Sequence, residues 1–189
     1  MNKSPRAVRY RYLLAPFIVY VPLNVQAFVW SLREGSLPMA WLLALVALGA
    51  FGWTLLEYLL HRIVHTGQGT AIGNVMARLH QGHHRNAAYE AKITTPLYGS
   101  LPIVIVLFGL LRLIGGGWEV SLMIMTGIIS GYLTYEAVHF RIHCSLKRGR
   151  ATAFRSAAHV FHHHHNQAQC FGVTTPLWDR VFGTNGGSK

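Results

Sequence analysis

The stretch LPMAWLLALVALGAFGWTLLEYLLHRIVH, residues 37–65, is the most informative part of the chain. Up to Leu60 it carries a single charge, Glu57, and it exceeds the roughly 20 apolar residues that a helix needs to cross a bilayer. It ends in HRIVH, so His61 and His65 lie four residues apart and share one face of a helix. The stretch predicts a membrane-spanning helix that ends in a pair of metal-ligating imidazoles.

Three further runs are equally apolar. Half of the chain (51%) is hydrophobic and 12% is charged, about half the charged share of a typical soluble domain. We therefore expect an all-α, integral membrane four-helix bundle made of two hairpins, with a cytoplasmic helical cap that carries the histidines. The alternative is a soluble all-α protein with four buried helices. The three further runs are Leu13–Leu32, Pro96–Ile114 and Trp118–Val138.

The formal net charge of +11 is distributed unevenly. Only Arg33 and Arg112 lie on the side opposite to the other basic residues. By the positive-inside rule, both termini and the loop between the second and third runs are cytoplasmic. The basic excess is then a topology signal and a match to anionic lipid headgroups, and nucleic acid is not the expected partner. The cytoplasmic cations are Lys3, Arg6, Arg9, Arg11, Arg62, Arg78, Arg85, Lys92, Arg141, Lys147, Arg148, Arg150, Arg155 and Arg180.

The expected organisation is one membrane domain, residues 13–182, between a basic N-terminal arm, residues 1–12, and a disordered Gly/Ser-rich tail, residues 183–189. Pro16 and Pro22 lie inside the first apolar run, which predicts a kinked or shallow helix. That run is also too long for a secretory signal peptide and lacks a small-residue cleavage site.

An internal repeat links the two halves of the domain, about residues 37–98 and 116–178. Each half contains an apolar hairpin segment, an HxxxH motif, an HxxHH motif and a TTPL-aromatic turn. The offsets between the halves are 78, 79 and 80 residues for the three motifs, so the agreement is hard to obtain by chance. Two such copies that face each other predict a centre with two metals. The motifs lie at 61–65 and 139–143, at 80–84 and 159–163, and at 94–98 and 174–178.

The histidines gather at the predicted cytoplasmic ends of the helices, where imidazole suits iron, zinc, copper or nickel. Ten ligands fit two ions at five each. His164 and His165 have no counterpart in the first half, so we leave them out of the ligand set. Cys144 and Cys170 are expected to be packing residues. The predicted ligands are His61, His65, His80, His83, His84, His139, His143, His159, His162 and His163.

The acidic residues are few, so their positions are informative. Glu57 precedes His61 by four residues, and Glu136 precedes His139 by three. A carboxylate there can accept the second N–H of a ligating imidazole and fix its tautomer. The alternative is a glutamate that reaches the headgroup region. Asp179, after the second TTPLW turn, is a further candidate for this role.

These residues resemble the fatty acid hydroxylase superfamily, from about Gly52 to Thr184. The resemblance rests on GWTLLEYLLHRIVH, LHQGHHRNA, GYLTYEAVHFRIH, HVFHH and FGVTTPLWDRVFGT, and two of these stretches are most similar to fatty acid 2-hydroxylases. It implies a non-haem di-iron monooxygenase that uses O2 and in which all ten histidines bind iron. Zinc could replace iron on purification. It also implies a lipid acyl substrate and a separate electron donor, either cytochrome b5-like or a ferredoxin with its reductase.

The first histidine box departs from the 2-hydroxylase pattern. That branch usually has four residues between the two histidines, whereas this chain has three, Arg62–Val64. Metal binding is unaffected, but the substrate is left open. A carotenoid, sterol or hopanoid is the alternative within the superfamily, and a membrane metal transporter or metal-binding protein is the alternative outside it.

Overall fold

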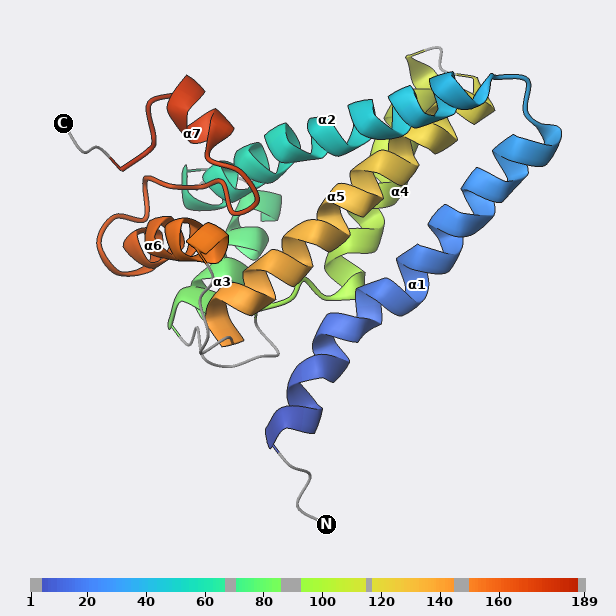
Figure 1. Cartoon of the computed structure of the whole chain (residues 1–189). Helices are drawn as coiled ribbons and strands as arrows, with labels where there is room; N and C mark the ends of the chain where they lie inside the picture. The colour runs from blue at the N-terminus through green and yellow to red at the C-terminus, as the bar shows by residue number, and fades with distance from the viewer. Residues whose placement is uncertain (1–4, 67–70, 86–92, 115–116, 145–149, 187–189) are drawn as a thin grey trace. The chain divides into compact units, whose positions relative to one another are not determined.

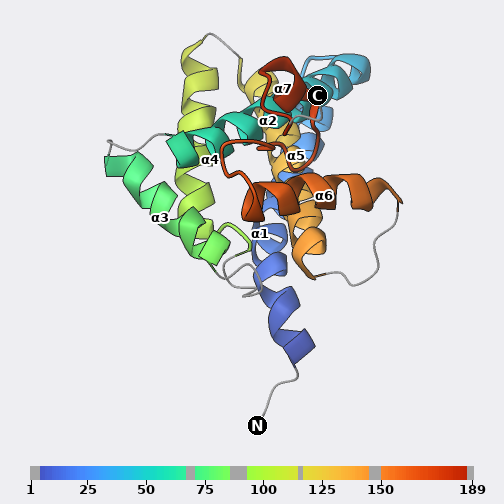
Figure 2. The same cartoon turned by 90° about the vertical axis from the view of Figure 1, so that its left-hand side faces the viewer.

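The computed structural model describes residues 5–66, 71–85, 93–114, 117–144 and 150–186, and these ranges contain only helices as regular structure. The all-α prediction is therefore confirmed for the described residues. Residues 1–4 of the expected arm, residues 187–189 of the expected tail, and Lys92, Lys147 and Arg148 lie outside them. The helices are α1 (Pro5–Glu34), α2 (Met39–Thr66), α3 (Ala71–Arg85), α4 (Leu97–Leu113), α5 (Trp118–Cys144), α6 (Arg150–His164) and α7 (Leu177–Val181) (Figures 1 and 2).

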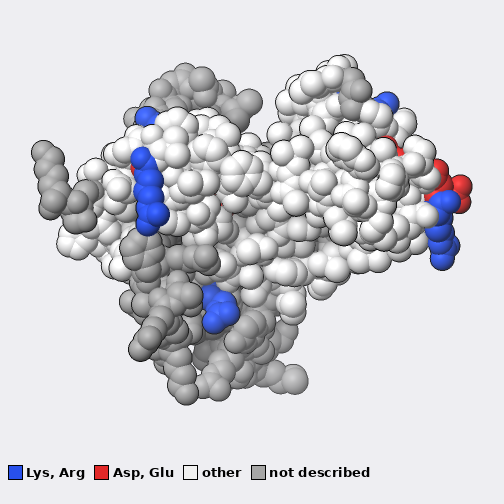
Figure 3. All heavy atoms as spheres, turned by 45° about the horizontal axis from the view of Figure 1, so that its top comes forward, with Lys and Arg blue, Asp and Glu red and all other residues white. Residues whose placement is uncertain are grey.

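Two of the four expected spans are long and apolar enough to cross a membrane. They are Leu13–Glu34 within α1 and Met39–Val64 within α2, with mean hydropathies of 1.6 and 2.0. Helix α4 is apolar but shorter, with 17 residues. Helix α1 continues through Pro16 and Pro22. In the view of Figure 3, most of the described surface is neither acidic nor basic, as expected for a chain with few charges.

The chain divides into two compact units, and the division falls within α2 and α5. The first unit comprises Met1–Trp53 and Thr95–Thr134. In it, α2 and α5 approach so closely that a Cβ at Gly49 would lie 2.0 Å from the carbonyl oxygen of Ile124. Small residues of this kind let helix backbones pack directly against each other, which is a common way to associate helices in a membrane.

Polar side chains link α1 to its neighbours within the first unit. The hydroxyls of Tyr20 and Ser100 lie 2.9 Å apart, which joins α1 to α4. Asn24 Nδ2 donates to the carbonyl oxygen of Thr126 at 3.2 Å and to Ser130 Oγ at 3.1 Å, which joins α1 to α5. Such hydrogen bonds satisfy polar groups that lipid cannot.

A carboxylate holds the turn between α1 and α2. Glu119 Oε2 accepts hydrogen bonds from the backbone N–H of Ser36 at 2.9 Å and of Leu37 at 3.3 Å. These N–H groups precede α2 and have no helical acceptor of their own. Glu119, at the start of α5, therefore joins this turn to α5.

The second unit comprises Thr54–Thr94 and Tyr135–Lys189, and it contains every predicted site residue. The short helix α7 packs against the last turns of α2. Trp178 Nε1 donates to Thr54 Oγ1 at 2.9 Å, and the ring of Phe182 stacks on Tyr58 with a centroid distance of 5.2 Å. Thr184, in the expected tail, makes a 2.8 Å hydrogen bond to Asp179.

Candidate metal centre

The histidines of the second unit converge in two groups, each of which can hold one metal ion. Within a group, one ring nitrogen of every member lies within 4.8 Å of the others. The members come from α2, α3, α5 and α6, so the site joins four helices. The first group contains His61, His80, His84 and His162, and the second contains His83, His139, His143, His159 and His163.

The two groups exchange one histidine. Successive residues of an α-helix point about 100° apart, so the members of HxxHH cannot all face one ion. In α3, His80 and His84 join the first group, whereas His83 joins the second. In α6 the assignment is reversed, since His162 joins the first group and its i−3 and i+1 neighbours join the second. The middle histidine of each HxxHH motif, His83 or His162, thus lies with the two outer histidines of the other copy.

The ring nitrogens of the first group face one another. His80 Nε2 lies 3.0 Å from His61 Nε2 and 2.9 Å from His84 Nε2. His61 also places Nδ1 2.6 Å from the carbonyl oxygen of Phe171, which can only accept. A neutral His61 therefore carries its hydrogen on Nδ1 and directs the Nε2 lone pair at the centre of the group, as a metal ligand does.

The second group shows a similar convergence. His159 Nε2 lies 3.1 Å from His139 Nε2, 2.9 Å from His143 Nε2 and 3.0 Å from His163 Nε2. A single N–H cannot satisfy three such neighbours, whereas a cation among the four nitrogens can. His139 Nδ1 lies 3.0 Å from the carbonyl oxygen of Ile93, which fixes its tautomer in the same way as in His61.

Burial keeps the second group neutral. Burial, followed by repulsion from His143 and His84, lowers the pKa of His83 to about 3. Burial, followed by repulsion from His83 and His143, lowers the pKa of His163 to about 2. Both nitrogens of His83 are buried without a hydrogen-bond partner among the described residues. Neutral imidazoles with unused lone pairs are the form that binds a metal, so the donor set fits a divalent ion.

Nine of the ten predicted ligands therefore lie in the two groups. The tenth, His65, belongs to α2, but its side chain lies outside the described residues. His164 and His165, which the repeat argument left out, are exposed and belong to neither group.

The three predicted carboxylates are all buried in the second unit. Glu57 Oε1 accepts from the backbone N–H groups of Val173 at 2.6 Å and Thr174 at 2.9 Å. Asp179 accepts from the N–H of Phe171 at 2.9 Å. These two carboxylates thus hold the chain near the first group. The oxygen next to Nδ1 of His61 is a backbone carbonyl. Glu136 is fully buried in α5.

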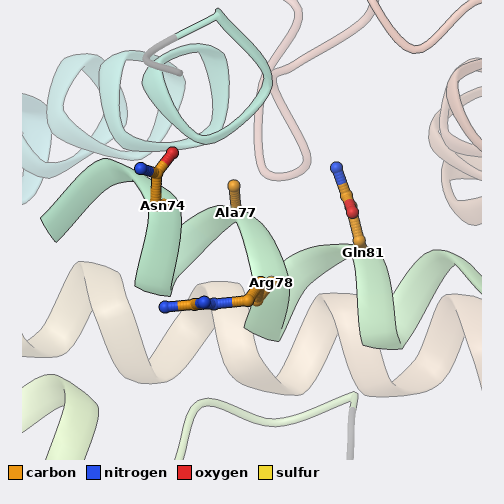
Figure 4. A pocket seen from close by; sticks show the side chains of 4 residues that line it. All are labelled: Asn74, Ala77, Arg78 and Gln81. Carbon is orange, nitrogen blue, oxygen red and sulfur yellow. The ribbon is translucent and has the colours of Figure 1, made fainter. Parts of the chain in front are cut away.

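A pocket of about 270 Å³ lies on α3 and is lined by none of the predicted ligands. Figure 4 shows that Asn74, Ala77 and Gln81 point to the same side of the helix, as their i, i+3 and i+7 spacing requires. Arg78 completes the lining. None of these four residues belongs to the histidine groups, so the pocket is not part of the candidate metal centre.

Sequence reasoning missed the backbone carbonyls that orient the rings. Besides those of Phe171 and Ile93, the carbonyl oxygen of Gln169 lies 2.7 Å from Nδ1 of His162. Every residue has a carbonyl group, so no side-chain pattern could have identified these three. The TTPLW turn, residues 174–178, was the sequence feature that marked this part of the chain.

The comparisons with known proteins agree on one family. The model of the fatty acid hydroxylase family matches residues 46–184. The chain is 31% identical to dihydroceramide fatty acyl 2-hydroxylase of Arabidopsis thaliana, over 77% of this chain and 62% of that protein. It is 30% identical to fatty acid 2-hydroxylase of Rattus norvegicus, over 85% of this chain and 45% of that protein.

A solved structure of full-length scs7p, in which only the hydroxylase domain is visible, has the same fold. The TM-score is 0.78 at 26% identity, and the match covers 91% of this chain and 66% of that chain. The chain spans between about half and two thirds of the length of these relatives. The family match contains all of the histidines in both groups. The resemblance seen in the sequence is confirmed, and the chain belongs to the fatty acid hydroxylase family.

Proposed function

We propose that this protein is a non-haem di-iron monooxygenase that hydroxylates the acyl chain of a lipid, as the names of its relatives suggest. The observation that carries the proposal is the convergence of histidine Nε2 atoms in two adjacent groups with an all-nitrogen donor set. Amino acid side chains alone cannot oxidise an unactivated C–H bond, so the metal must supply that chemistry.

Iron is the metal that fits this reaction. Two bound ferrous ions would supply the reduction of O2, with two electrons from the C–H bond and two from a donor, to give the alcohol and water. Zinc could occupy the same nitrogens in a purified sample. The role of the protein is to hold neutral imidazoles in fixed tautomers and to exclude water from them.

The internal repeat completes the ligand set. His143 belongs to the second group, and His65 is its equivalent at an offset of 78 residues. Helix α2 extends to Thr66, so His65 follows His61 on the same face, one turn later. We assign His65 as the fifth ligand of the first ion, which gives each ion five histidines.

The membrane supplies the substrate. Two helices have the length and composition of spans, and we propose that α4 and α5 complete a four-helix membrane bundle with both termini and the metal centre in the cytoplasm. The basic residues at the predicted cytoplasmic loops support this orientation. An acyl chain would then enter from the bilayer, and a separate cytochrome b5-like protein or ferredoxin would deliver electrons.

Lipid analysis tests the proposed reaction. The host would be compared with and without the gene, in the presence of a co-expressed electron-transfer chain, by mass spectrometry of its hydrolysed lipids. We expect acyl chains that gain one oxygen atom, at carbon 2, and no gain with His162→Ala. A changed carotenoid, sterol or hopanoid without any hydroxylated acyl chain would contradict the acyl assignment and leave the metal centre standing.

A further inference from the structure

Residues 169–174, which we call the orienting segment, contact two ligands of the same histidine group. The carbonyl oxygen of Phe171 accepts from Nδ1 of His61 at 2.6 Å, and that of Gln169 accepts from Nδ1 of His162 at 2.7 Å. A carbonyl can only accept, so both rings must carry their hydrogen on Nδ1. The position of the segment therefore sets the tautomer and the direction of two Nε2 lone pairs.

The N–H groups of the same segment are held by two buried carboxylates. Asp179 accepts from Phe171 at 2.9 Å and from Gly172 at 2.8 Å. Glu57 accepts from the next two N–H groups, and its other oxygen accepts from Thr174 Oγ1 at 2.6 Å. Four successive N–H groups thus end on two carboxylates. Hydrogen bonds to a charged acceptor are about twice as strong as neutral ones.

The backbone of the segment has little freedom to move. A Cβ at Gly172 would lie 2.2 Å from the carbonyl oxygen of Thr175 and 2.9 Å from Asp179 Oδ2, so only glycine fits there. Cys170 has a φ of 59°, in the left-handed region that non-glycine residues rarely adopt. Its N–H donates to the carbonyl oxygen of Thr184 at 2.7 Å, which extends the fixed region to five consecutive N–H groups.

One ligand of the second histidine group is oriented from elsewhere. Its His139 uses the carbonyl of Ile93, which lies outside the orienting segment. A disturbance of Glu57 or Asp179 should therefore reach the first group before the second. The segment connects these carboxylates to two ligands of the first group, because Nδ1 of His61 and Nδ1 of His162 each lie against one of its carbonyl oxygens.

We propose that Glu57 and Asp179 are positioning residues that hold the orienting segment and thereby control metal binding at the first histidine group selectively. The inference rests on the proposed two-ion centre. The proposed role does not require a carboxylate to contact an imidazole, because each carboxylate acts through the peptide groups of the orienting segment. It also explains why two acidic side chains, 4% and 2% exposed, are buried beside the TTPLW turn.

The test measures iron in the purified full-length protein in detergent, by elemental analysis and by Mössbauer spectroscopy after loading with ⁵⁷Fe(II). For Glu57→Ala and Asp179→Ala we expect one of the two iron signals to be lost, or its release to a chelator to be accelerated about 10- to 100-fold, as for other groups that orient ligands. Glu57→Gln should restore much of the retention, because an amide oxygen can still accept from both N–H groups.

Glu119→Ala is the matched control, since it removes another carboxylate that holds backbone N–H groups, but in the first unit. We expect it to retain both ions. Alanine variants that keep both ions with wild-type release rates and spectra would overturn the inference. It would also be overturned if Glu57→Ala and Glu57→Gln each lost the two ions to the same extent. A wild-type protein that binds fewer than two ions would instead refute the proposed function.

Discussion

The two nitrogens of each oriented imidazole have different tasks. Nδ1 donates to a backbone carbonyl in His61, His139 and His162, and Nε2 is left for the metal. A hydrogen bond at Nδ1 raises the basicity of the opposite nitrogen and prevents the ring from rotating. These three rings are therefore oriented for metal binding before any ion arrives.

His83 is the residue that best separates a ligand from a packing histidine. It is buried, and its two nitrogens find no hydrogen-bond partner among the described residues. We expect His83→Ala to lower bound iron from about two ions to about one per chain, because the second group loses one of its donors. Elemental analysis of the membrane-extracted protein measures this.

His164→Ala is the control for that experiment. His164 lies on the same helix as three ligands, but it is exposed and belongs to neither group. The control should keep both ions. Full iron content in His83→Ala, or equal losses in the two variants, would refute the assignment of His83 to the second ion.

At the residue scale, the sequence predicts which histidines come together but not how they are divided between the two groups. The i, i+3 and i+4 spacing of His80, His83 and His84 indicates one helical face, but it does not indicate which of them bind the same ion. The structure places His83 in the other group, because the 100° step between neighbouring residues of α3 separates its ring from that of His84. That division depends on where α6 lies, which local spacing does not encode.

Helices α2 and α5 carry the ligands because they extend beyond their apolar runs. The apolar runs end at Leu60 and Val138, and the helices continue to Thr66 and Cys144. Hydropathy marks where a helix could meet lipid, and hydrogen bonding decides where it ends. The first turns past the apolar runs therefore hold HxxxH in helical geometry, which a loop could not do.

The close crossing of α2 and α5 gives a test at the scale of elements. Gly49→Ala would place a methyl group 2.0 Å from a backbone oxygen, and we expect a loss of about 1–3 kcal/mol in the free energy of unfolding. Gly52→Ala, in the same helix, meets nothing within 4 Å and should gain up to about 1 kcal/mol from helix propensity.

Unfolding in mixed micelles of increasing SDS content compares the two variants directly. The substitution, the helix and the detergent are the same, so the difference reports the crossing alone. If Gly49→Ala were as stable as Gly52→Ala, the close backbone contact between α2 and α5 would be wrong.

On the scale of the whole molecule, the chain combines a unit whose helices pack through small residues and a unit whose helices meet at the histidines. The repeat in the sequence predicts the second unit well, because both copies contribute the same motifs. It predicts the contacts of the first unit poorly, since apolar runs facing lipid and apolar runs facing other helices look alike.

Metal removal should therefore affect the two units differently. In the second unit, the imidazoles of α2, α3, α5 and α6 would converge on the proposed ions, and without ions their ring nitrogens face one another at about 3 Å. Ions that bind only the folded form stabilise it according to their concentration and affinity, by about 2.7 kcal/mol at 100 times Kd.

Chelation should thus raise amide hydrogen exchange in residues 54–66, 71–85, 135–144 and 150–186, as measured by mass spectrometry in detergent. Exchange in residues 13–53 and 95–134 should stay within about twofold of the metal-loaded protein, because glycine packing and the hydrogen bonds of Tyr20 and Asn24 do not involve the ions. An equal increase throughout the chain would show that the two units unfold together, and no increase in the second unit would show that the histidine groups are stable without metal.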